Sequence, residues 1–188
     1  LLTKDETDGL DFTFGNAVGA TSLGAEMEVR RSLKGWFESG PLSRLGAQVN
    51  AAYISTSVDL GKKAVGQSGE RPLMGQSPYV VNAGLYYTDT DHKFQCNVLY
   101  NVIGPRLFAV GTFGTPDIYE MPRNVVDVTL TKGLGERFEV KLSAQDVLNQ
   151  RTRLIQDSNE DGSLNSVDEE VMSFRRGGYF SAGLSYRF

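Results

Sequence analysis

The last nine residues of the chain alternate between two kinds of side chain. Every second residue back from the terminus is apolar, namely Phe180, Ala182, Leu184, Tyr186 and Phe188. Apart from Gly183, the residues between them are polar. Successive side chains of a β-strand point to opposite faces, so Ser181, Ser185 and Arg187 share the face away from the apolar stripe. The pattern predicts a strand with one face toward lipid and the other toward a wetter interior. The alternative is a half-buried edge strand of an ordinary sheet.

The composition excludes membrane insertion by helices. Hydrophobic residues make up 40% of the chain, and the mean hydropathy is −0.27. Even with glycine counted as apolar, the longest apolar runs, such as 107–111, have about five residues, whereas a transmembrane helix needs roughly 20. A transmembrane barrel is compatible with this polarity, because each strand needs only every second residue to be apolar over roughly 9–11 residues.

The counts of special residues narrow the class further. The chain has 21 Gly, 8 Tyr and 10 Phe against one His and one Cys, which indicates a β-rich protein without a redox or metal cluster. Cys96 has no partner for a disulfide within the chain. The net charge of −4 argues against nucleic-acid binding. His92 falls in a predicted short turn, away from the long loops, so a Ser-His-Asp hydrolase has no base there. The sequence therefore predicts no catalytic residues and no enzyme.

Eight stretches show the alternation of a half-buried strand. They are residues 10–14, 23–29, 45–53, 81–87, 94–102, 126–130, 138–144 and 180–188. We expect the side chains of one parity to share a lipid-facing side, among them Val126, Val128, Leu130, Val140, Leu142, Phe180, Leu184 and Tyr186. The sequence predicts an all-β, antiparallel transmembrane β-barrel wall.

The connections between these stretches sort by length. Short turns at 88–91 and 133–136 fall on the side of Phe188, and long loops at 59–76, 103–122 and 149–172 fall on the opposite side. Two connections depart from the rule: a tight hairpin is expected at 19–22 on the long-loop side, and a longer turn at 34–42 on the short-turn side. Trp36 and Phe37 of that turn are candidates for an interfacial aromatic belt. Bacterial barrels have short periplasmic turns and long external loops.

The segment 157–168 imitates a calcium-binding loop. Its candidate ligands, in the spacing of such loops, are Asp157, Asn159, Asp161, the backbone carbonyl of Ser163, and Asp168, with Gly162 at the sharp turn. The twelfth position is Asp where a bidentate Glu is usual, with Glu169 and Glu170 as substitutes. The alternative is a solvated external loop, which needs Asp, Asn and Gly for its turns alone. Calcium is the one cofactor that the sequence suggests.

Two further groups of residues are candidates for ligand contact at the external rim. Arg175 and Arg176, beside Gly177 and Gly178, are candidates for an anionic ligand or a surface sugar. Phe108, Phe113 and Tyr119 are candidates for stacking on a sugar or a hydrophobic ligand. The alternatives are ordinary rim charge for the arginines and packing inside a folded loop for the aromatic residues.

Several stretches resemble the C-terminal part of a TonB-dependent outer-membrane receptor, of the Bacteroidota type that carries an N-terminal carboxypeptidase-regulatory-like domain. They are residues 71–79 followed by 82–85, residues 100–104, residues 116–123 and residues 146–149. At 146–149 the broader family has an Asn-aliphatic-aromatic-Asn motif, and here Asp146 and Leu148 replace two of those types. The resemblance runs from about Gly24 to Phe188.

This resemblance implies that residues 1–188 are about eight C-terminal strands of a larger barrel of about 22 strands, without its plug domain and earlier strands. Leu1 is then the start of a processed chain or of a fragment. The implied function is active transport of an unidentified nutrient across the outer membrane, with the C-terminus in the periplasm. The implied partners are outer-membrane lipid, the TonB energy-coupling complex through the missing N-terminal part, the barrel-assembly machinery through Phe188, and a surface lipoprotein.

Two other interpretations of the chain stay open. It is alternatively a complete eight-stranded barrel that acts as an anchor or adhesin, since a barrel of about eight strands is filled by its own side chains. It is alternatively a barrel subunit of a larger surface or secretion assembly. Neither gives it a catalytic centre.

Overall fold

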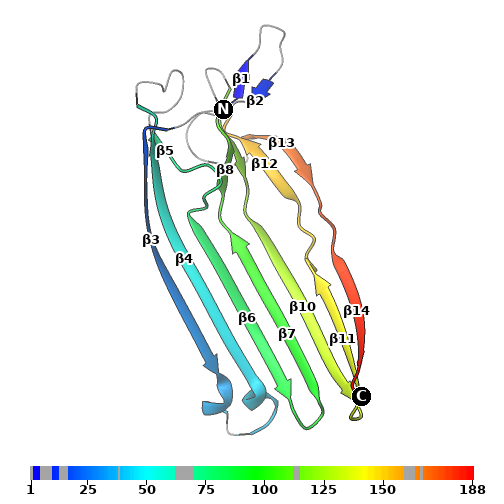
Figure 1. The fold of residues 1–188 in the computed structure, drawn as a ribbon. Coiled ribbons are helices and arrows are strands. Elements are labelled where there is room, and N and C mark those ends of the chain that lie inside the picture. The colour runs from blue at the N-terminus through cyan, green and yellow to red at the C-terminus, as the bar shows by residue number, and fades with distance from the viewer. Residues whose placement is uncertain are drawn as a thin grey trace.

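A computed structural model describes residues 2–4, 10–12, 17–37, 39–61, 70–111, 115–158, 164–165 and 167–188. One antiparallel sheet contains seven long strands, in the order β14-β11-β10-β7-β6-β4-β3. They are β3 (Gly19–Ser32), β4 (Leu45–Asp59), β6 (Tyr79–Asp89), β7 (Phe94–Ile103), β10 (Arg123–Leu134), β11 (Phe138–Gln145) and β14 (Tyr179–Tyr186). The two-residue β5 (Glu70–Arg71) pairs with the end of β4. Figure 1 shows the long strands side by side in one curved layer, with β3 and β14 at opposite edges.

The structure has a strand at each of the eight predicted stretches, seven of them in the large sheet, and corrects two details. Residues 13 and 14 of the first stretch lie outside the described residues. Leu10–Phe12 is a strand (β2), but it pairs with β1 (Leu2–Lys4) in a separate hairpin and does not join the large sheet. Alternation predicts that a segment is extended, and it does not select the partner strand. The tight hairpin expected at 19–22 is also wrong, because these residues belong to β3 and pair with 56–59 of β4. Small residues that favour turns are here held in a continuous ladder.

The lengths of the connections sort as predicted. The β6–β7 and β10–β11 turns lie at the end of the sheet that carries the C-terminus (Figure 1). The β3–β4 connection lies there too and contains two 3-10 helices, η1 (Leu33–Gly35) and η2 (Pro41–Arg44). In this connection the guanidinium carbon of Arg31 lies 5.1 Å from the centre of the Trp36 ring, a cation–π distance.

At the other end of the large sheet, two of the long connections fold into strands of their own. They form a four-stranded antiparallel sheet, here called the small sheet, in the order β13-β12-β9-β8. Its strands are β8 (Arg106–Ala109), β9 (Ile118–Glu120), β12 (Thr152–Gln156) and β13 (Glu169–Phe174). The buried apolar side chains, such as Leu107, Ile118 and Ile155, are concentrated there. The large sheet has no second layer among the described residues, because its strands pack side by side without a covering element.

The register of the large sheet brings the apolar stripes of neighbouring strands together. One row of directly paired residues crosses six strands and consists of Leu45, Tyr87, Cys96, Leu130, Leu142 and Ala182. The adjacent row consists of Gly46, Tyr86, Asn97, Thr129, Ser143 and Ser181. Paired residues share a face and consecutive residues do not, so the two rows lie on opposite sides. We call the side of the first row the apolar face and the other side the polar face.

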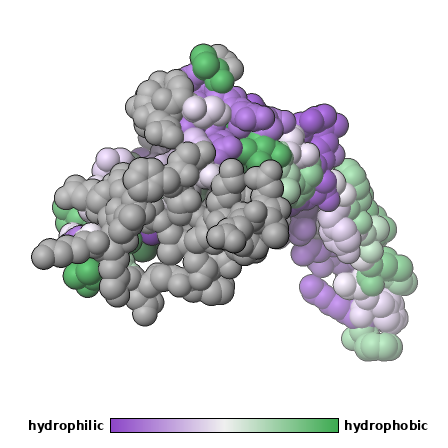
Figure 2. Space-filling model, turned by 90° about the horizontal axis from the view of Figure 1, so that it is seen from above, coloured by the Kyte–Doolittle hydropathy of each residue, from purple (hydrophilic) through white to green (hydrophobic). Residues whose placement is uncertain are grey.

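The apolar face is exposed in the structure. Large side chains on it include Leu23, Phe180 and Leu184, with exposed fractions of 76%, 73% and 69%. In the view along the strands, the part of the sheet that is not drawn in grey is purple on one side and green on the other (Figure 2). The shared parity of the predicted lipid-facing residues is thus confirmed. Among the described residues, no helix is long and apolar enough to cross a membrane.

The polar face carries a line of side-chain hydrogen bonds across four strands. Asn101 Nδ2 donates to Asn82 Oδ1 at 2.6 Å, and Asn82 Nδ2 donates to Asn50 Oδ1 at 3.4 Å. Asn50 Nδ2 in turn donates to Glu26 Oε1 at 2.6 Å. These groups satisfy one another within the sheet and leave a hydrophilic surface on the side opposite the apolar face.

Gly104, directly after β7, is a position where only glycine fits. A Cβ at this position would lie 2.7 Å from Tyr79 Cε1 and 2.9 Å from Ser77 Oγ. We expect Gly104→Ala to lower the free energy of unfolding by about 1–3 kcal/mol, as overpacking does in well-packed sites. Denaturant titration in detergent micelles measures the change. The matched control is Gly19→Ala, because nothing lies within 4 Å of a Cβ there. Equal midpoints for the two variants would contradict the expected clash.

Candidate functional site

A polar cavity lies at the end of the large sheet that carries the long connections, where the large sheet meets the small sheet. We call it the junction cavity. It has a volume of about 110 Å³. Strands β7 and β10 contribute Asn101, Arg123 and Val125 from the polar face, and strands β8 and β9 contribute Arg106 and Glu120. Arg176, between β13 and β14, completes the charged lining.

Arg106 and Glu120 face each other across the β8–β9 pair. Arg106 Nε and Nη2 both donate to Glu120 Oε2, at 2.9 and 2.6 Å. Both side chains are partly exposed to the cavity. Two donors on one carboxylate oxygen hold the guanidinium plane in a defined orientation.

Arg123 is held from behind by Asp146. Arg123 Nη1 donates to Asp146 Oδ2 in a short ion pair whose side chains are only 17% and 12% exposed. The backbone N–H of Asp146 donates to Asp127 Oδ1 at 2.8 Å. A guanidinium so far from water needs this partner, because an unpaired buried charge is costly.

Residues 146–149 form a tight turn between β11 and β12. Asp146 and Asn149 have φ of 51° and 42°, in the left-handed region that Asp and Asn tolerate better than most residues. The N–H of Asn149 donates to the Asp146 carbonyl at 2.9 Å, and the N–H of Val147 donates to the Val126 carbonyl at 2.9 Å. Asn149 Oδ1 accepts the N–H of Gly177 at 3.1 Å. The turn thereby anchors both Arg123 and the backbone next to Arg176.

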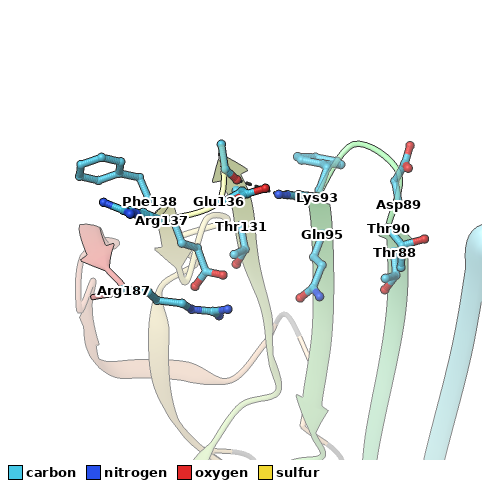
Figure 3. Close-up of a pocket in the computed structure, with 14 residues that line it drawn as sticks. Thr88, Asp89, Thr90, Lys93, Gln95, Thr131, Glu136, Arg137, Phe138 and Arg187 are labelled. Atoms are coloured by element: carbon cyan, nitrogen blue, oxygen red, sulfur yellow. Dashed lines mark hydrogen bonds between the residues drawn. The ribbon is translucent and has the colours of Figure 1, made fainter.

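A larger cavity of about 300 Å³ lies at the short-turn end (Figure 3). Its lining mixes basic residues such as Lys93 and Arg187 with acidic residues such as Glu136. Lys93 Nζ donates to the Gly135 carbonyl at 2.8 Å, across the two turns (Figure 3). Because its charges are balanced, this cavity indicates no particular class of ligand.

His92 lies in the β6–β7 turn, as predicted. Its Nδ1 is 2.9 Å from Asp89 Oδ2. Asp89 also forms an ion pair with Arg44 of η2, and Arg44 Nη2 donates to Asp91 Oδ2 at 2.6 Å. The group ties the β3–β4 connection to the β6–β7 turn, so its visible role is to hold two connections together.

The described part of the proposed calcium loop consists of its two ends. Asn159, Asp161 and Ser163 lie outside the described residues. Asp157 is largely buried and its N–H donates to the Asp117 carbonyl at 3.2 Å, while Asp168 Oδ2 accepts the N–H of Asn165 at 2.7 Å. No group of three or more His, Cys, Asp or Glu that could hold a metal occurs among the residues described. Calcium binding here stays a prediction.

The predicted rim residues separate in the structure. Arg176 lines the junction cavity and Arg175 does not. Tyr119 is half-buried on β9, and Phe108 of β8 is half-exposed, whereas Phe113 lies outside the described residues. Tyr119 precedes Glu120 in the strand and therefore points to the other face of the small sheet, away from the junction cavity. These aromatic residues and Arg176 thus do not form one site.

Behind the junction cavity, Arg71 and Tyr119 lie among the carboxylates of the small sheet. The Nε and Nη1 atoms of Arg71 are buried without a hydrogen-bond partner, and burial lowers the pKa of its guanidinium although Asp117 opposes this. Burial, together with the charges of Asp117 and Asp157, raises the pKa of the Tyr119 phenol above its ordinary value. The cluster connects β5, which belongs to the large sheet, with the small sheet.

The raised pKa of Tyr119 predicts alkaline sensitivity of the small sheet. In the unfolded chain this phenol ionises near pH 10, and in the folded chain it ionises at higher pH. The neutral Tyr119 phenol therefore contributes its full share to the free energy of unfolding below about pH 10. This contribution is lost as the pH rises toward the pKa that the phenol has in the folded chain. We expect Tyr119→Phe to flatten the fall in stability above pH 10, measured by denaturation at a series of pH values. An unchanged alkaline profile in this variant would assign the effect to other groups.

Comparison with known proteins does not assign the chain to a family. No family model matches the chain, and none of the curated proteins or solved structures compared with it matches either.

Sequence reasoning found part of the junction cavity. It named Arg176 as a candidate for ligand contact. Residues 116–123, which include Glu120 and Arg123, and residues 146–149 were named only as stretches that resemble the receptor family, and Arg106 was missed. The sequence carries little sign that Arg106 and Glu120 belong to one site, because only the β8–β9 pairing brings them together.

Proposed function

We propose that this chain forms part of the wall of an outer-membrane β-barrel of the TonB-dependent receptor type, which imports a scarce nutrient. The observation that carries the proposal is the continuous apolar face over the large sheet, opposite a polar face. A contiguous apolar surface of this extent on a protein in water marks an interaction or membrane site. Outward apolar side chains alternating with inward polar ones are the pattern that a barrel presents to lipid.

The two ends of the sheet support an orientation. Short turns and the C-terminus lie at one end, and the long connections with the small sheet lie at the other. In bacterial barrels the short turns are periplasmic and the long loops external. The small sheet and the junction cavity are then on the cell surface, and Phe188 is in the periplasm, where the barrel-assembly machinery acts.

The edges of the large sheet support a wall that is larger than this chain. Strands β3 and β14 are its two edges and do not pair with each other among the described residues. An unpaired edge exposes a row of backbone N–H and C=O groups, which is not tolerated within lipid. A barrel that includes further strands provides hydrogen-bond partners for both edges.

In such a barrel the polar face lines the interior, where a plug and a nutrient are expected. Energy coupling through TonB and a surface lipoprotein complete the proposed assembly.

Uptake by cells tests the proposed transport. The intact polypeptide that carries this sequence is expressed with and without the inner-membrane energy-coupling proteins, and accumulation of candidate nutrients is measured. Energised transport requires uptake to be lost without coupling. Uptake that persists without coupling would indicate a passive pore. The intact mass is the second measurement, since a polypeptide of only about 20.6 kDa would favour the small-barrel anchor.

A further inference from the structure

We propose that the junction cavity binds the anionic oxygens of a ligand, with Arg176 as a direct contact. The argument rests on the charges and anchoring of the residues around this cavity. It does not depend on transport, because a barrel that serves as an anchor would bind an anion at the same place.

The charges that line the cavity do not balance. Three guanidinium groups line it, and the carboxylate among the lining residues is Glu120, which pairs with Arg106. Behind the lining, Asp146 pairs with Arg123, and Asp127 accepts the backbone N–H of Asp146. Arg176 makes no ion pair or side-chain hydrogen bond with the described residues, and it is exposed. At the cavity wall, positive charge therefore exceeds negative charge, and Arg176 is the guanidinium that lacks a partner among the described residues. An anion brings the charge that compensates it.

The paired arginines also keep unused donors. A guanidinium has five N–H groups. Arg106 uses its Nε and Nη2 toward Glu120, and Arg123 uses its Nη1 toward Asp146. The remaining N–H groups of the two guanidiniums are hydrogen-bond donors at the cavity wall. Planar guanidinium groups match the oxygens of carboxylates and phosphates.

The side chains of Arg106 and Arg123, and the backbone beside Arg176, are held before any ligand arrives. Asp146 fixes Arg123, Glu120 fixes Arg106, and Asn149 fixes the backbone of Gly177 beside Arg176. Pre-organised donors lose less conformational entropy on binding. The cavity of about 110 Å³ is large enough to admit one carboxylate or phosphate group. We therefore infer a subsite for the anionic group of a larger ligand.

Titration with inorganic phosphate and with acetate tests the subsite, using the intact polypeptide in detergent micelles and calorimetry at constant ionic strength. Binding of either probe by the wild type is expected, and the stronger one identifies the preferred oxyanion. Removing a charge-assisted contact in Arg176→Gln should weaken the affinity about tenfold. The matched control is Arg175→Gln, which removes the same charge from the adjacent residue outside the cavity and should keep the affinity of the wild type.

Three results would overturn the subsite: no binding of either probe to the wild type, equal affinities in the wild type and Arg176→Gln, or an equal loss in Arg175→Gln. Because Arg176 is exposed, folding of the variant is expected to be unaffected, and the heat-dependent shift of the folded barrel on a gel checks this. Membrane insertion and uptake are measured separately, so failure of the anion subsite is distinguishable from failure of the proposed transport.

Discussion

Leu142→Arg should prevent stable insertion of the barrel into a bilayer. Leu142 lies on the apolar face in the middle of β11, paired with Leu130 and Ala182, and its side chain is 47% exposed. If lipid covers this face, an arginine there costs about 2–4 kcal/mol near the bilayer midplane. The measurement is the free energy of unfolding from lipid vesicles by denaturant titration.

The neighbouring Ser143 supplies the control for this result. It lies one residue further along the same strand, on the polar face, where Thr129 Oγ1 donates to Ser143 Oγ at 3.4 Å. Ser143→Arg introduces the same charge and bulk toward the opposite side, and we expect a mild effect. If both variants insert and unfold alike, the apolar face is not the lipid-facing side and the proposed membrane function loses its main support.

Asp146→Asn should cause the second large loss of stability, about 3 kcal/mol, because it leaves the largely buried guanidinium of Arg123 without its charge partner. Asparagine has a similar shape and tolerates the left-handed backbone at this position, so the substitution changes the charge without straining the turn. Denaturant titration of the folded protein measures the loss.

A surface ion pair on the same large sheet provides the comparison. Arg30 Nη2 lies 3.2 Å from Glu28 Oε1, and the side chains are 70% and 54% exposed. Exposed pairs of this kind contribute at most about 1 kcal/mol, so Glu28→Gln should change stability little. An equally small effect of Asp146→Asn would show that the Arg123–Asp146 pair is not a structural requirement of the junction.

Individual strands of the large sheet were predictable because the polarity of each residue indicates which face of the strand its side chain occupies. The alternation in 126–130 and in 138–144 is a local property, and it is sufficient to predict an extended segment and the parity of Leu130 and Leu142. The short turns at 88–91 and 133–136 were recognisable for the same reason, since a turn between antiparallel neighbours needs only a few residues of suitable type.

The small sheet was not predictable in this way. Arg106–Ala109 and Ile118–Glu120 are strands of four and three residues, too short to show alternation above chance. The pairing of Ile118–Glu120 with Thr152–Gln156 joins segments that are more than 30 residues apart, and no local pattern in either segment specifies the other. Packing between two long connections decided that they fold together.

The sequence by itself determined an all-β chain with strands of two unlike faces, sorted connections and a candidate arginine at the rim, because these depend on local alternation and turn chemistry. The tertiary structure alone decided that Leu10–Phe12 pairs with β1, that 19–22 extends β3, and that Arg106, Arg123 and Arg176 meet at one cavity. These outcomes depend on which backbone edges pair and on which charges become buried. Those are properties of residues distant in the chain, whose contacts form only when the strands are assembled.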